Sequence, residues 1–387
     1  MQECSKKRRA PAAAETTRWH PCDPVRVLAL VPSLPGHSPG QRSTIELWTR
    51  VLEREGIHVD LSAFESLALR NVLGRAGHNW TKAREMARGL WRRSRLLEDL
   101  SPYDAVFVYR EAALLGPAVF ERWVASRGTP LIYALDDPLF IPYVSPANGY
   151  LSYLKCFGKV RTICRLSRAV IVNSASLAEF AAQFNQNVFR IPSVVDGAVY
   201  RFIPRSQPRR PCIGWSGSAT TAGNLGVVEA SLRELARRAR FDLHLIGSAA
   251  TRIPGLDHTA QDWDADTEVA DLRRMDIGLV PLPDNPWNHY KFYLKVVQYM
   301  ALGIVPVATP LGSNPEVIEH GVTGFLARTS GEWTGFLGQL VQDNALRVRM
   351  SRQAAEYAHQ RFTVEAQASS ILAAFRSAAP APAFSGS

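Results

Sequence analysis

Short β-type segments alternate with helical segments along most of the chain. Val25–Val31 is β-rich, and a helical pattern over residues 44–55 follows it and ends at Gly56. The same rhythm predicts four more strands, at Ala105–Tyr109, Leu131–Leu135, Ala169–Val172 and Val188–Ile191. Strands that alternate with helices are typical of a parallel sheet covered by helices. We therefore expect a doubly wound, Rossmann-like α/β domain over residues 24–201.

The pattern restarts after a segment that has three prolines and no periodicity, residues 202–211, which we interpret as a linker. Helices are expected over residues 227–240 and 291–302. Five strands are expected around them, at Cys212–Ser216, Asp242–Ile246, Ile277–Val280, Val305–Ala308 and Gly324–Ala327. This second Rossmann-like domain spans residues 212–377, and its last helix is expected to pack back on the first domain. Because ligands bind at the carboxyl ends of parallel strands, we expect the site in the cleft between the two domains.

The composition indicates a globular protein, with 46% hydrophobic and 21% charged residues among 387. No apolar run reaches the roughly 18 residues that span a bilayer. Residues 1–23 begin with a basic cluster but lack the apolar stretch of a secretory signal, so we expect a disordered tail there and another at 378–387. Five cysteines without a C-x-x-C pair favour reduced thiols. We predict a cytoplasmic protein.

The net charge of +10 is concentrated in one stretch. Residues 70–95 contain eight basic side chains and one acid, Glu85. Apolar side chains recur there at roughly helical spacing, namely Trp80, Met86, Leu90, Trp91 and Leu97. Such a helix can contact an anionic membrane or an anionic acceptor. A solvated helix face explains the same charges, and both interpretations stay open.

Two loops are candidates for binding an anion through the main chain. Residues 32–42 form a Gly/Pro loop that runs into a helix, without the G-x-G-x-x-G dinucleotide pattern. Gly214–Ser218 follows a strand with small residues that let a ligand approach the backbone. The second loop nearly matches the hydrolase pattern G-x-S-x-G, but Ser218 stands in place of the last glycine. A hydrolase is therefore disfavoured.

Two acidic groups lead to different expectations. Asp262, Asp264 and Asp266 alternate without the glycine turn and final Glu of a calcium loop, so we interpret them as helix-capping residues rather than metal ligands. Asp136-Asp137 follow a strand, where a carboxylate can reach a cleft and accept a proton or a hydroxyl hydrogen bond. A surface turn would also explain this second pair.

Two lysines stand out because only seven of the 45 basic residues are lysines. Lys291 and Lys295 lie four apart at the start of an expected helix, where residues i and i+4 share a face. Two ammonium groups at the positive end of a helix repel each other unless an anion lies between them. A diphosphate would fit there, although two solvated lysines remain the alternative.

The region around these lysines resembles the donor site of the retaining glycosyltransferases called family 4. The resemblance is carried by residues 291–309, 312–318 and 321–326. Segments that agree with a bacterial branch of that family are Gly40-Gln41-Arg42, Ile45–Trp48, Tyr109–Ala112, Pro130–Asp137, Val172-Asn173-Ser174, Ile191–Asp196 and Ile213–Ser218. The resemblance covers roughly residues 25–377.

The resemblance implies a two-domain GT-B fold and transfer of a hexose from a nucleotide-diphosphate sugar to a hydroxyl, with retention, without a metal and without a cofactor. Nucleic acid is not an expected partner. Lys291 and Lys295 would be catalytic, and Asp136 would orient the acceptor from what looks like the family's histidine position. The residues expected to bind the donor are Gly40, Arg42, Gly217, Ser218, Phe292, Leu294 and Gln298.

The chain departs from the family at two acidic positions. The family carries glutamates eight positions apart, where this chain has Tyr290 and Gln298. Gln298 can still hydrogen-bond a ribose hydroxyl, but Tyr290 cannot act as a carboxylate. Two alternatives to a transferase therefore stay open: a degenerate protein that only binds a nucleotide sugar, and a nucleotide-sugar epimerase of the same fold.

Overall fold

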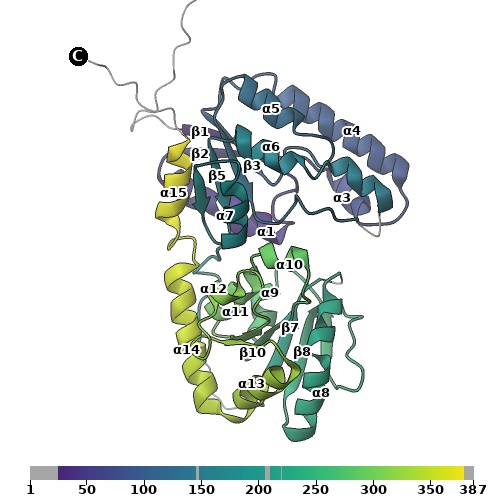
Figure 1. Ribbon diagram of the computed structural model, residues 1–387, viewed down its shortest axis with the longest axis vertical. Coiled ribbons are helices and arrows are strands. Elements are labelled where there is room, and N and C mark those ends of the chain that lie inside the picture. The colour runs from purple at the N-terminus through teal and green to yellow at the C-terminus, as the bar shows by residue number, and fades with distance from the viewer. Residues whose placement is uncertain (1–24, 145–147, 205–209, 219, 379–387) are drawn as a thin grey trace, which may run out of the picture.

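The computed structural model describes residues 25–144, 148–204, 210–218 and 220–378. It contains two six-stranded sheets, one in each half of the chain, whose strands all run parallel (Figure 1). The expected tail at 1–23 and most of the tail at 378–387 lie outside the described residues, as does the middle of the expected linker. Each sheet has helices on both faces, which is the architecture that the alternating pattern predicts.

The N-terminal sheet has the strand order β2-β1-β3-β4-β5-β6. Its strands are β1 Val25–Val31, β2 Ile57–Ala63, β3 Ala105–Tyr109, β4 Leu131–Leu135, β5 Ala169–Val172 and β6 Val188–Arg190. The strands β3, β4 and β5 are buried throughout, because helices cover both faces of the sheet. The helices of this domain are α1 Pro39–Gln41, η1 Arg42–Glu46, α2 Leu47–Arg54, α3 Leu67–Leu73, α4 Asn79–Leu96, α5 Val119–Ser126, η2 Gly149–Lys155, α6 Lys159–Leu166 and α7 Ala175–Ala182.

The C-terminal sheet has the order β12-β11-β10-β7-β8-β9. Its strands are β7 Cys212–Ser216, β8 Asp242–Gly247, β9 Thr259–Asp262, β10 Ile277–Val280, β11 Val305–Ala308 and β12 Phe325–Leu326. The helices that follow in the chain are η3 Ala222–Val227, α8 Glu229–Arg238, α9 Glu268–Leu272, α10 Pro286–Tyr290, α11 Leu294–Ala301, α12 Asn314–Val317, α13 Ser330–Gln342, α14 Asn344–Arg361 and α15 Ala368–Ser377.

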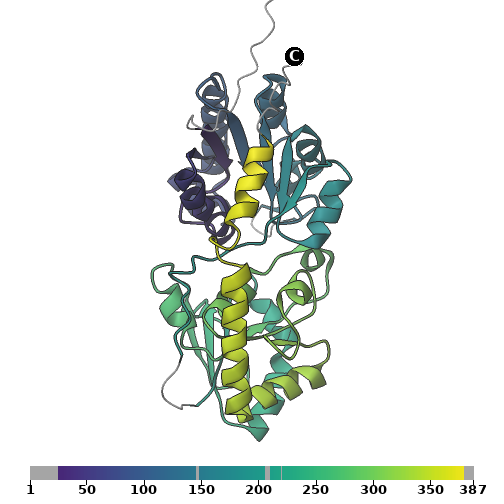
Figure 2. The same cartoon turned by 90° about the vertical axis from the view of Figure 1, so that its left-hand side faces the viewer.

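The last helix belongs to the core of the first domain. Ile371, Ala374 and Phe375 of α15 are buried against the N-terminal sheet, and the Phe375 ring stacks on Phe107 with 5.5 Å between centroids. The helix before it, α14, packs on α11 of the other domain. Figure 2 shows the two yellow helices in line, one on each domain. The chain therefore crosses between the domains twice.

Several elements differ from the sequence-based expectation. The strands β2 and β9 were not predicted; both lie at sheet edges, where polar residues interrupt the apolar pattern. The helix expected over residues 44–55 is interrupted at Thr44, whose backbone is non-helical. The helix expected from residue 291 begins at Leu294. None of the described helices is both long and apolar enough to span a membrane.

Candidate functional site

A basic cluster lies at the carboxyl end of β7 in the C-terminal domain. Lys295 is the second residue of α11, and its ammonium donates a hydrogen bond to Ser216 Oγ at 3.1 Å. Ser216 is the last residue of β7, and its backbone N–H donates to the Tyr299 hydroxyl at 2.8 Å. Burial lowers the pKa of Lys295 to about 8, Glu268 acts against that shift, and Lys291 adds to it. The ammonium therefore stands in a site that favours a bound anion.

A buried carboxylate that the sequence analysis missed completes this cluster. Glu268, at the start of α9, accepts hydrogen bonds from Trp263 Nε1 at 3.0 Å, from the Tyr200 hydroxyl at 3.0 Å and from Gln298 Nε2 at 3.3 Å. Arg42 of the N-terminal domain reaches the same carboxylate at 3.8 Å. The expected donor residues Arg42 and Gln298 thus meet around one acid. In the sequence, Glu268 follows the aspartates at 262–266 closely, but it belongs to no recognised motif, so the pattern did not single it out.

A second cluster lies at the carboxyl end of β4 in the N-terminal domain. Both oxygens of Asp136 are engaged: Arg110 donates to them at 2.6 and 2.8 Å, and the Tyr109 hydroxyl donates at 2.5 Å. Burial acts to lower the pKa of Arg110, but Asp136 and its neighbour Asp137 raise that pKa well above its usual value. Asp136 is therefore a fixed carboxylate, held by a paired guanidinium.

Asp137 joins the two domains. It accepts from Arg110 at 2.6 Å and lies 3.2 Å from the ammonium of Lys291, which follows α10. Burial acts to raise the pKa of Asp137, but Lys291 and Arg110 hold it below its usual value. Because Lys291 precedes α11, the expected i, i+4 pairing with Lys295 on one helix is wrong: Lys291 is in extended backbone, and Lys295 lies in the first turn.

Gly40 brings the N-terminal loop against the second cluster. A Cβ at this position would lie 2.6 Å from the Tyr109 hydroxyl and 2.7 Å from Asp136 Oδ2. No side chain fits there without displacing one of these groups. The carbonyl of Gly40 accepts from the Thr44 hydroxyl at 2.6 Å, which fixes the loop ahead of Arg42.

The other residues expected to bind the donor surround Lys295 or precede it. Gly217 follows Ser216, and its N–H donates to the Ile246 carbonyl at 2.8 Å. The N–H of Ser218 donates to the Thr221 hydroxyl at 2.9 Å. Phe292 is buried in the core of the C-terminal domain, so only its backbone can face a ligand. Leu294 is the first residue of α11, where backbone N–H groups lack helical partners.

Tyr290, at the first position where the family has a glutamate, packs between the domains. Its ring meets Phe140 edge to face at 5.1 Å, and its carbonyl accepts from the Ser174 hydroxyl at 2.7 Å. Both partners belong to the N-terminal domain. The side chain at this position therefore holds the domains together and supplies no charge.

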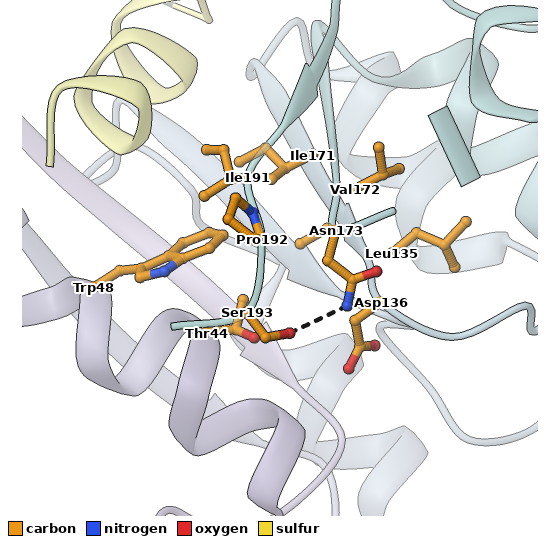
Figure 3. A pocket seen from close by; sticks show the side chains of 11 residues that line it. Thr44, Trp48, Leu135, Asp136, Ile171, Val172, Asn173, Ile191, Pro192 and Ser193 are labelled. Carbon is orange, nitrogen blue, oxygen red and sulfur yellow. Dashed lines mark hydrogen bonds between the residues drawn. The ribbon is translucent and has the colours of Figure 1, made fainter. Parts of the chain in front are cut away.

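A small cavity of about 10 Å³ lies beside Asp136, between β4, β5 and the helix α2 (Figure 3). Asn173, just after β5, donates to the Ser193 hydroxyl at 3.2 Å across this space. Its buried Oδ1 has no hydrogen-bond partner among the described residues. An unpaired amide oxygen close to a fixed carboxylate can accept a hydroxyl hydrogen bond.

The aspartates at 262–266 have local roles. Asp262 accepts from the Ala249 N–H at 2.9 Å, and Asp264 accepts from the Asp266 N–H at 2.8 Å. The N-cap position of α9 belongs to Thr267, which makes no side-chain capping hydrogen bond, so the expected helix capping by these aspartates is wrong. Within the part of the chain that the structure describes, no group of three or more His, Cys, Asp or Glu side chains could hold a metal ion.

Solved structures share this two-domain architecture over most of the chain. HepE from Anabaena, in complex with UDP and glucose, is 17% identical with a TM-score of 0.63, and the alignment covers 91% of this chain and all of that one. Sucrose-phosphate synthase from Thermosynechococcus elongatus is 12% identical with a TM-score of 0.65, and the alignment covers 92% and 98%. This chain has the GT-B fold.

Sequence similarity adds to this structural likeness. Residues 210–343 match the family Glycosyl transferases group 1. A 77-residue segment, 19% of the chain, is 36% identical to N-acetyl-alpha-D-glucosaminyl L-malate synthase from Bacillus anthracis. That segment spans a fifth of the length of the curated relative. The family match lies in the half of the chain that holds Lys295, Ser216 and Glu268.

Proposed function

We propose that this protein is a glycosyltransferase that moves a hexose from a nucleotide-diphosphate sugar to a hydroxyl acceptor. The observation that carries the proposal is the cationic cluster at the end of β7, inside the region that matches Glycosyl transferases group 1. The presence of UDP and glucose in the HepE complex supports a nucleotide-sugar donor. Within the proposal the enzyme is retaining, belongs to family 4, and uses neither metal nor cofactor.

In the proposed mechanism, cations stabilise the charge that develops on the leaving diphosphate. Lys295 already donates to Ser216 at the end of β7, and Leu294 opens α11, where backbone N–H groups lack helical partners. The N–H groups of Gly217 and Ser218 donate to Ile246 and Thr221, so these two residues would have to give up those hydrogen bonds to bind a phosphate. Lys291 and Arg42 would transfer from Asp137 and Glu268 to the phosphates when donor binds. Preorganised charges of this kind lower a barrier because they need no rearrangement in the transition state.

The N-terminal cluster would hold the acceptor. Asp136 is fixed by Arg110 and Tyr109, so it can accept a hydrogen bond from an acceptor hydroxyl without moving. We add Asn173, which lines the same small cavity as Asp136 and whose amide oxygen has no partner among the described residues, as a second acceptor-binding residue. On the donor side the Nε2 of Gln298 is engaged by Tyr200 at 2.7 Å, so a ribose hydroxyl would have to meet its carbonyl oxygen.

The experiment incubates the protein with a panel of nucleotide sugars, with and without hydroxyl acceptors, and analyses the products. A glycosylated acceptor with the donor's anomeric configuration, formed in the presence of EDTA, supports the whole proposal. An isomerised sugar without acceptor indicates an epimerase, and binding without turnover indicates a degenerate protein. A thermal-shift screen finds the donor first, because a ligand at 100 times its Kd adds about 2.7 kcal/mol of stability.

The proposal also places the protein in the cytoplasm, in peripheral contact with an anionic membrane or an anionic acceptor. The basic residues of α4 support this contact, because six of the 18 residues of that helix are Lys or Arg.

A further inference from the structure

The two faces of α4 differ sharply in character. The stripe that faces the domain contains Glu85, Met86, Gly89 and Arg93, all buried. On the opposite side, Trp80, Arg84, Trp91 and Arg95 follow one another at spacings of four, seven and four residues, which places them in one line on a helix. The outward line therefore alternates between a large aromatic ring and a guanidinium.

The tryptophans of this line are exposed to an unusual degree. Trp80 is 80% exposed and Trp91 is 64% exposed. Spacing in the sequence groups Met86 and Leu97 with these tryptophans, but both are buried in the domain core. Spacing alone therefore does not show which apolar residues lie on the outer face. Indole rings that pack against nothing in the domain are costly in water and prefer the boundary between water and lipid.

The charge of the outer face has a single sign. The only acid of α4, Glu85, is buried; it accepts from the Ser66 hydroxyl at 2.9 Å and from Arg88 at 2.6 Å, and it lies 3.3 Å from Arg84 Nε. It adds no exposed negative charge to the helix, although it balances part of the charge of these two arginines. Arg84 and Arg95 have side chains that are 49% and 62% exposed. Arg95 also contacts Glu98, just past the end of the helix, at 2.7 Å.

A second exposed apolar segment adjoins the beginning of α4. The residue before η2, Asn148, accepts from Lys82 of α4 at 2.8 Å and donates to the Leu73 carbonyl of α3 at 3.3 Å. The large apolar side chains that η2 exposes, more than half in each case, are Tyr150, Leu151, Tyr153 and Leu154. Lys155 ends the segment.

Neither the C-terminal domain nor α15 covers this part of the molecule. Figure 1 shows α4 on the outer side of the N-terminal domain, away from the C-terminal domain and on the other side of the sheet from α15. From these observations we propose that the outward line of α4 and the exposed side chains of η2 form one docking surface for a bilayer that contains anionic lipid. Tryptophan rings would enter the headgroup region while arginines pair with lipid phosphates.

This inference specifies the membrane contact of the proposed function, but the docking does not depend on transfer activity. The enzyme would then act at a membrane surface, with its acceptor domain against the lipid. An acceptor that is itself anchored in the lipid follows as the matching substrate class. Vesicle binding is measured without donor, so a failure of docking and a failure of transfer are separate results.

The test is co-sedimentation of the full-length protein with vesicles of phosphatidylcholine alone and of phosphatidylcholine mixed with phosphatidylglycerol, at low and high salt. We expect binding to the anionic vesicles only, weakened by salt. Trp80→Ser with Trp91→Ser should lower the partition coefficient by about tenfold or more. Arg84→Gln with Arg95→Gln should lower it about thirtyfold, and both variants should keep the wild-type melting temperature.

A matched control removes two exposed arginines elsewhere. Arg237→Gln with Arg238→Gln on α8 changes the net charge equally, and we expect wild-type vesicle binding. If the control lost as much vesicle binding as Arg84→Gln with Arg95→Gln, net charge alone would explain the binding, and the assigned surface would be wrong. No binding by the wild type, together with self-association that the Trp80→Ser, Trp91→Ser variant abolishes, would identify a protein interface instead. Unchanged binding by Tyr150→Ser with Leu154→Ser would exclude η2 from the surface.

Discussion

The two charged clusters of the cleft differ in their balance. Around Asp136 and Asp137, two carboxylates meet the two cations Arg110 and Lys291, so the charges cancel. Around Glu268, Arg42 lies 3.8 Å from the carboxylate, and Lys295 is near enough for Glu268 to raise its pKa, so one carboxylate faces two cations. A surplus cation at the end of a strand suits an anionic ligand, whereas a balanced cluster fixes geometry. The difference supports the proposal that the C-terminal domain binds the donor phosphates and the N-terminal domain binds the acceptor hydroxyl.

The largest effect is expected at the surplus cation. Lys295→Ala should lower the rate constant of transfer at saturating donor by roughly a hundredfold to a thousandfold, because one preorganised charge contributes about 2.7 to 4 kcal/mol to the barrier. Lys295→Arg should restore little, since a planar guanidinium cannot occupy the place of a compact ammonium. Single-turnover transfer measures this. Arg352→Ala, an exposed cation of the same domain, serves as the control; a near-normal rate for Lys295→Ala would refute the assignment.

The next effect concerns the fit of the loop against the balanced cluster. Gly40→Ala should force the Tyr109 hydroxyl or Asp136 to shift, because its Cβ would lie at 2.6 to 2.7 Å from them. Overpacking of this kind costs about 1 to 3 kcal/mol, which urea unfolding measures. Gly223→Ala, whose Cβ would meet nothing within 4 Å, is the matched control. Equal stability of both variants would show that Tyr109 and Asp136 can shift to accommodate the methyl group at little cost in free energy.

A smaller effect is expected in the pH dependence of donor binding. Since the pKa of Lys295 is about 8, its ammonium is present below that pH and is lost above it, so affinity for a nucleotide diphosphate should fall as pH rises past about 8. Glu268 raises that pKa, so Glu268→Gln should move the onset of the fall to lower pH. Calorimetric titration with UDP across the pH range tests this. An unchanged onset would mean that Glu268 has only a structural role.

The smallest effect is expected where the two domains touch. Asp137→Asn removes the charge that pairs with Lys291 and with Arg110. Because Arg110 keeps both oxygens of Asp136 and Lys291 is partly exposed, we expect a loss of stability of only about 1 kcal/mol. The freed lysine should bind UDP slightly better. Calorimetry on the variant and on Glu316→Gln, which breaks another interdomain pair, that with Arg190, separates the two contacts. If UDP bound more weakly to Asp137→Asn but not to Glu316→Gln, Asp137 would assist UDP binding instead of competing with UDP for Lys291.

The sequence predicted the strands with uniform apolar runs and two Rossmann-like domains, because buried parallel strands have a strong local pattern. The GT-B fold was implied by the resemblance to family 4, and it is confirmed. It missed β2 and β9, whose edge positions require apolar residues on fewer sides. It brought Lys295 and Asp136 into consideration through motifs, but not Glu268 or Arg110. Their importance comes from long-range contacts, such as the 3.8 Å approach of Arg42 to Glu268, which no local spacing records.

The position of α15 has a consequence for the order of folding. The N-terminal core includes Phe375 and its neighbours in α15. Where the chain crosses between the domains for the second time, the Val195 N–H donates a hydrogen bond to the Phe362 carbonyl at 2.9 Å. During synthesis domains generally fold from the N-terminus onward. Here the first domain to leave the ribosome lacks its last core helix until residue 377 has been made. The domain that begins first is therefore completed last, and cleavage in residues 202–211 would separate it from part of its own interior.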